Sequence, residues 1–141
     1  MKLRTAAVSV AALAAVGATA LPAQADSGNA RPAAEETVVQ PLAGQDIRMI
    51  YKVGGHEVGR GAFYSQGDRI WVKDSRADGR GVRVQYDLNY NPGAPDGQCS
   101  APGGSGTSKF CDYNFRENGK IRIRIVAGSH TSAWSPWANI G

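Results

Sequence analysis

Residues 82–90 read VRVQYDLNY, and no other stretch of the chain is as informative about its fold. Apolar or aromatic side chains occupy every second position, and arginine, glutamine, aspartate and asparagine stand between them. Because successive side chains of a strand point to opposite faces of a sheet, this period of two predicts a strand with one buried face and one face in water. The chain shows no convincing period of 3.6 residues, so we expect strands rather than helices.

The same alternation recurs in residues 47–53 and 121–125, which we also expect to be strands. Weaker strand patterns cover residues 62–65, 69–73 and 132–137. Pro136 makes the last of these an edge strand or the end of a strand, because proline lacks the amide hydrogen that a central strand needs. Clusters of Gly, Asn, Asp and Pro separate the runs. The sequence therefore predicts an all-β fold, a small antiparallel β-sandwich or barrel.

Residues 1–25 have the features of a cleavable export signal. Lys2 and Arg4 are followed by an uncharged run of small and apolar residues at 6–21, and the small-x-small pattern of residues 23–25 marks a cleavage site. We expect cleavage after Ala25, because the apolar run is too short and too rich in alanine for a spanning helix. The remaining chain is then exported to the extracellular space.

Residues 26–46 differ in composition from residues 47–141. They contain no aromatic residue and one arginine against four acids, which predicts a flexible leader. Val38, Val39 and Leu42 leave open the alternative of a docked edge segment. Residues 47–141 are then the folded domain, with 13 Lys and Arg against 8 Asp and Glu, a net charge of 13 − 8 = +5. Such a charge attracts anionic surfaces or simply keeps the domain soluble.

Cys99 and Cys111 are the only cysteines. In an exported protein they are expected to form a disulfide. The bridge closes a 13-residue loop (111 − 99 + 1), which is worth about 3 kcal/mol in the chain-entropy description. This bridge would tether the glycine- and proline-rich residues 91–109, and we predict that they form an ordered surface loop.

The stretch AFYSQGDRIWVKDSRADGRGVRV (residues 62–84) resembles a pattern found in small secreted actinobacterial proteins of unknown function. That pattern has the form F-x-S-x-G-D-x-x-x-V-x-D-x-x-A-D-G and is followed by an alternating strand. The resemblance implies export and a β-rich domain. It implies no biochemical activity and no catalytic residue.

The most distinctive candidates for a binding surface are Trp71, Arg83, Arg122 and Arg124. If Ile70 and Val72 point into the core, Trp71 points to water, and the three arginines occupy the polar positions of their strands. These four residues would together form a basic, aromatic sheet surface suited to an anionic polymer.

Two further tryptophans lie near the C-terminus, in AWSPW (residues 133–137). We expect them either to close one end of the sandwich or to stack on Arg122 and Arg124. A similar W-S-x-W phrase occurs in thrombospondin-type repeats, where tryptophan and arginine side chains stack. Those repeats carry several more cysteines, so the resemblance does not extend to their fold.

No motif for catalysis, metal or cofactor binding is recognisable. His56 and His130 lack the spacing of a zinc protease, and no serine occupies a nucleophile elbow. We therefore expect a secreted, non-enzymatic protein that binds an extracellular or cell-envelope polymer or protein, without cofactor, nucleic acid or membrane contact after cleavage. Two alternatives stay open: an inhibitor or toxin acting through the Cys99–Cys111 loop, and a small hydrolase using either histidine.

Overall fold

The structure, a computed structural model, describes residues 32–41 and 45–141. The predicted export signal at residues 1–25 lies outside these residues, as do positions 26–31 and 42–44 of the predicted leader. No helix long and apolar enough to cross a membrane occurs in the part of the chain that is described.

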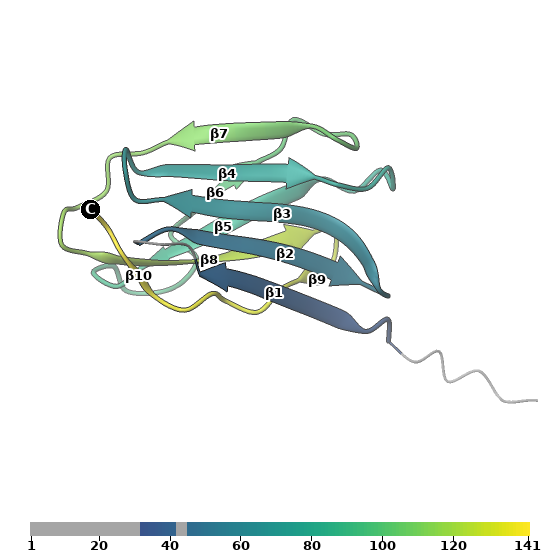
Figure 1. The fold of residues 1–141 in the computed structure, drawn as a ribbon, viewed down its shortest axis with the longest axis horizontal. Coiled ribbons are helices and arrows are strands. Elements are labelled where there is room, and N and C mark those ends of the chain that lie inside the picture. Colours follow the sequence, from purple (N-terminus) through teal and green to yellow (C-terminus); the bar gives the residue numbers. More distant parts are fainter. Residues whose placement is uncertain (1–31, 42–44) are drawn as a thin grey trace, which may run out of the picture. The chain divides into compact units, whose positions relative to one another are not determined.

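The described residues form strands and turns only, in two antiparallel sheets (Figure 1). The strands of the first sheet lie in the order β1-β2-β3-β4-β7, and those of the second in the order β10-β8-β5-β6, with β9 also paired to β8. Their bounds are β1 Glu35–Pro41, β2 Ile47–Val53, β3 His56–Tyr64, β4 Arg69–Asp74, β5 Val82–Leu88, β6 Gly97–Ser100, β7 Ser108–Asp112, β8 Lys120–Ala127, β9 His130–Thr131 and β10 Ala138–Asn139. The expectation of a small all-β, antiparallel fold is confirmed, and two separate packed sheets make it a sandwich.

The core lies between the two sheets and is built from the alternating positions of the sequence. β3 and β4 of the first sheet pack against β8 and β5 of the second. The inward side chains of β2, β4, β5 and β8 are almost fully buried, among them Met49, Ile70, Val84 and Ile123. Ile70 and Val72 point into this core as predicted, so Trp71 between them points outward.

The prediction of a flexible leader is wrong for residues 35–41. They form β1, which pairs with all of β2 from Glu35 opposite Val53 to Pro41 opposite Ile47. The open edge of β2 supplies the backbone hydrogen bonds, and Val39 packs against the core. Composition favoured a leader because the segment has few apolar residues, but an edge strand needs few of them.

The region predicted as one irregular surface loop, residues 91–109, contains β6 and the start of β7. β6 is the outer strand of the second sheet and β7 the outer strand of the first. The predicted disulfide between Cys99 of β6 and Cys111 of β7 is present, with Cα atoms 5.9 Å apart. It therefore joins the two sheets at one edge of the sandwich, where no backbone pairing connects them.

Residues 132–137 do not form the predicted strand, although they follow β8 along its edge. The Ser132 amide donates to the Ile125 carbonyl and the Ile125 amide donates to the Ser132 hydroxyl, at 2.8 and 2.9 Å. Ser135 makes the same pair of bonds with Ile123, at 2.8 and 3.0 Å. Serine hydroxyls thus replace strand carbonyls as acceptors, and the segment advances three residues for every two of β8.

β3 is longer than the predicted residues 62–65. It begins at His56 and includes Gly59 and Gly61. Both glycines face the second sheet. A Cβ atom at Gly59 would lie 2.6 Å from Val82 Cγ1, and one at Gly61 would lie 2.6 Å from Val84 Cγ2. The absence of side chains at these two positions lets β3 approach β5 closely.

Candidate functional site

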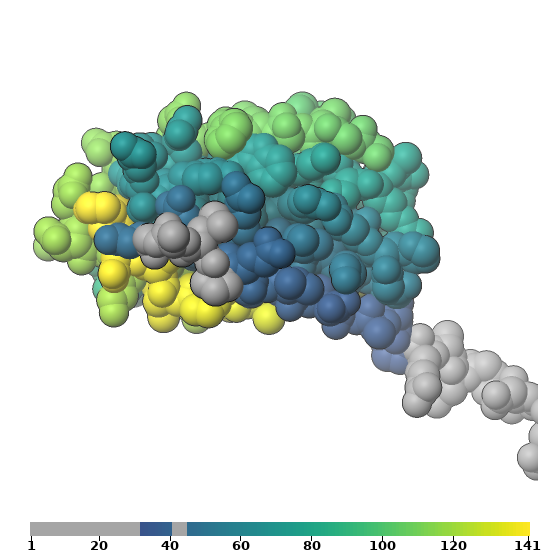
Figure 2. All heavy atoms as spheres, viewed as in Figure 1, coloured from purple at the N-terminus to yellow at the C-terminus, as the bar shows by residue number. Residues whose placement is uncertain are grey.

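Trp71 lies in the middle of a row of side chains that crosses the outer face of the first sheet. The strand register places Arg48 opposite Ala62, Ala62 opposite Trp71 and Trp71 opposite Phe110. Figure 2 views the molecule from the side of this sheet. The small Ala62 is fully buried although it points outward. The larger side chains on both sides of it therefore project further from the sheet than Ala62 does.

An aromatic cluster forms one side of this row. The Phe110 ring lies 6.1 Å from the ring of Tyr64 and 6.4 Å from that of Trp71, with tilted planes. The Arg69 guanidinium lies 5.5 Å from the centre of the Phe110 ring. Phe110 is 50% exposed, which is unusual for a phenylalanine and marks this cluster as a candidate contact surface.

A groove of about 400 Å³ runs beside the cluster, lined by Gln40, Arg48, Met49, Ile50, Arg60, Gly61, Tyr64, Trp71 and Phe110. Two arginines and no acidic residue are among these described lining residues. Arg60 makes a bidentate ion pair with Glu57, at 2.7 and 2.8 Å, and this contact lowers the pKa of Glu57. Arg48 is exposed and has no ion pair with any residue of the described part of the chain.

Arg83, Arg122 and Arg124 lie on the second sheet, not beside Trp71. Arg83 is on β5 and the other two are on β8. Because the inner faces of the two sheets pack against each other, the outer faces point in opposite directions. The single surface predicted for Trp71 and the three arginines is therefore not formed. Alternation assigned each residue to a polar face but carried no information on which strands share a sheet.

The two C-terminal tryptophans stack on the arginines of β8, which confirms that interpretation of the AWSPW phrase. The Arg122 guanidinium lies 4.9 Å from the Trp134 ring centre and 4.7 Å from that of Trp137, and the Arg124 guanidinium lies 4.4 Å from Trp134. Trp137 is 43% exposed on the outer face, so it does not close the end of the sandwich.

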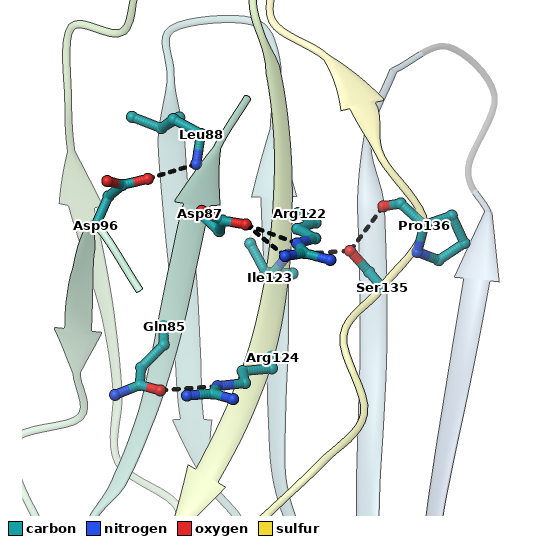
Figure 3. A network of polar contacts seen from close by, with 9 residues as sticks. All are labelled: Gln85, Asp87, Leu88, Asp96, Arg122, Ile123, Arg124, Ser135 and Pro136. Atoms are coloured by element: carbon teal, nitrogen blue, oxygen red, sulfur yellow. Dashed lines mark hydrogen bonds and ion pairs between the residues drawn. The ribbon is translucent and has the colours of Figure 1, made fainter. Parts of the chain in front are cut away.

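Polar partners from β5 fix these arginines in place (Figure 3). The Nε and Nη2 atoms of Arg122 each lie 2.7 Å from Oδ2 of Asp87, and Arg124 Nε donates to Gln85 Oε1 at 2.9 Å. Asp87 is buried. The alternating cations and rings form a ladder, Trp137–Arg122–Trp134–Arg124, on the outer face of the second sheet.

The two histidines lie apart. His56 is exposed at the start of β3, whereas His130 of β9 contacts Glu35 of β1, with Nδ1 and Oε1 2.9 Å apart. The hydrogen bond from His130 is the main reason that the pKa of Glu35 is lowered. Neither imidazole is hydrogen-bonded to a serine or threonine hydroxyl of the described residues, so a hydrolytic serine–histidine pair does not form among them.

Tyr51 of β2 is fully buried, and its hydroxyl has no hydrogen-bond partner in the described part of the chain. Burial, with a smaller effect of the Glu35 carboxylate, raises the Tyr51 pKa to about 12. No group of three His, Cys, Asp or Glu side chains with metal-binding geometry occurs within residues 32–41 and 45–141.

Sequence reasoning missed Phe110, Tyr64 and Arg48 as parts of the Trp71 surface. Phe110 belongs to a region expected to be irregular, and only the pairing of β7 with β4 places it opposite Trp71. The one local signal was its position next to Cys111, because a disulfide restrains its neighbours and the side chain before an inward cysteine points outward.

No protein-family model matches this sequence, and no curated protein and no solved structure is significantly similar to the chain.

Proposed function

We propose that this is an exported, non-catalytic binding protein that holds an acidic polysaccharide in the groove beside Trp71. One observation carries the proposal: three clustered aromatic rings, including the half-exposed Phe110, stand across a groove from Arg48. Aromatic rings pack on the apolar faces of sugar rings, and guanidinium groups bind carboxylates in bidentate fashion. The combination favours a ligand with both chemical features.

Export is supported by the signal-like residues 1–25 and by the disulfide, which is compatible with an oxidising compartment. A non-catalytic role is supported by the residues of the site. The described residues that line the groove offer arginine, glutamine and aromatic side chains, without a carboxylate, histidine or serine among them that would act as acid, base or nucleophile.

Binding to polygalacturonate, measured by calorimetry with protein recovered from the culture medium, tests the proposal. Trp71→Ala removes the central ring of the row and is expected to weaken binding at least tenfold, which corresponds to about 1.4 kcal/mol. Arg48→Gln keeps most of the side-chain volume and is expected to weaken binding and to reduce its dependence on salt.

Trp137→Ala is the matched control, because it removes an exposed tryptophan from the opposite face. It is expected to bind polygalacturonate like the unmodified protein. Melting temperatures of all variants separate loss of binding from loss of folding. The proposal is wrong if the unmodified protein does not bind the acidic polymer, or if folded Trp71→Ala and Arg48→Gln proteins bind as well as the original.

A further inference from the structure

A second groove, of about 530 Å³, lies on the outer face of the second sheet. It is found where β5 ends and β8 begins, and it is lined by Asp87, Leu88, Asn89, Asn91, Gly93, Ala94, Lys120, Arg122 and Trp137. It shares no residue with the groove beside Trp71. Because the two grooves belong to the outer faces of different sheets, they are two separate candidate sites.

Trp137 presents a fixed aromatic surface to this groove. Arg122 covers part of the indole at 4.7 Å, and Asp87 holds the guanidinium through two 2.7 Å contacts. Asp87 is itself 5% exposed, so its carboxylate is largely shielded from water. A side chain that is already held in place loses little conformational entropy when a ligand packs on it.

The polar groups of the groove both donate and accept hydrogen bonds. The Asn89 Oδ1 atom accepts from the Lys120 amide at 2.6 Å, which leaves its NH₂ group as a donor. The Asn91 side-chain amide offers both functions, and the Asp87 carboxylate accepts. Asp87 also offsets the charge of Arg122, and Lys120 is a second cation among the lining residues.

We propose that the groove at Trp137 is a second binding site, which holds a carbohydrate ring. A sugar ring has a flat apolar face that packs on an indole and hydroxyl groups that both donate and accept, which matches the asparagine side chains beside Trp137. The site is independent of the function proposed for the Trp71 groove.

Nuclear magnetic resonance tests this assignment, since each tryptophan gives a separate indole N–H signal that single Trp→Phe variants assign. Titration with cellotetraose, an uncharged oligosaccharide, is expected to shift the Trp137 signal and to leave the Trp71 signal in place. Trp137→Ala and Asn91→Ala are each expected to weaken binding at least fivefold. Asn91 is exposed, and its side chain makes no hydrogen bond to another described residue, so Asn91→Ala preserves the fold.

Trp71→Ala is the control and is expected to bind cellotetraose unchanged. An unmoved Trp137 signal at millimolar cellotetraose would overturn the inference, as would equal binding by folded Trp137→Ala protein. Loss of cellotetraose binding in Trp71→Ala would also overturn it, by placing the sugar on the other face. Failure with polygalacturonate affects only the proposed function, because that experiment probes the first groove.

Discussion

Replacing Gly61 with alanine tests the close approach of the two sheets, on which the position of β3 and of its outer face depends. A Cβ atom at residue 61 would lie 2.6 Å from Cγ2 of Val84 and 3.3 Å from Cγ1 of Ile125. Both neighbours are fully buried, so neither side chain can turn into solvent. The added methyl group must therefore push β3 away from β5 or force Val84 out of its preferred rotamer.

Two opposing effects set the size of the change. Alanine restricts the unfolded chain and would by itself stabilise the protein by about 0.4–1 kcal/mol. Overpacking of a dense core costs about 1–3 kcal/mol. We expect Gly61→Ala to lower the free energy of unfolding by about 1–2 kcal/mol, measured by urea denaturation monitored by tryptophan fluorescence.

A double-mutant cycle with Val84→Ala isolates the contact. Val84→Ala removes the atom that the new methyl group meets, so the two substitutions together should be less destabilising than the sum of their separate effects, by at least 0.5 kcal/mol or so. Gly81→Ala is the control, because a Cβ atom there meets no atom within 4 Å. Full stability of Gly61→Ala, or strict additivity with Val84→Ala, would refute the packing described for β3 and β5.

Two other predictions concern groups at the edge and in the core of the sandwich. Replacing both Cys99 and Cys111 with alanine is expected to lower the free energy of unfolding by about 3 kcal/mol, since the bridge closes a 13-residue loop (separation 12); an unchanged urea midpoint would contradict this. Tyr51→Phe removes a buried hydroxyl for which the described part of the chain offers no partner in hydrogen-bonding geometry, and it should stabilise the protein by about 1 kcal/mol at neutral pH. The Tyr51 pKa is about 12 in the folded protein against 10.0 ordinarily. Above pH 10 the unfolded chain therefore loses this proton first, and stability falls between pH 10 and 12. Urea titrations across this range should show a smaller fall for Tyr51→Phe, and parallel curves for the two proteins would count against burial of the hydroxyl.

The fold class, the strands β2, β4, β5 and β8 with part of β3, and the disulfide could all be predicted from the amino-acid sequence. Alternation in residues 47–53, 82–90 and 121–125 specified which side chains face the core, because a strand has only two faces and one of them must be buried. The alternation in residues 69–73 also predicted that Trp71 points outward, between the inward Ile70 and Val72. Two cysteines in a short chain left only one intramolecular pairing.

The neighbours of each strand became known only from the three-dimensional structure. Trp71 and Arg122 carry equivalent local signals, yet one joins Phe110 on the first sheet and the other joins Trp137 on the second. The docking of β1 and the strands β6 and β7 likewise depend on sheet edges that distant residues provide. Local periodicity records which face of a strand is wet, whereas the composition of that wet face depends on long-range pairing, which leaves no trace in a local stretch of sequence.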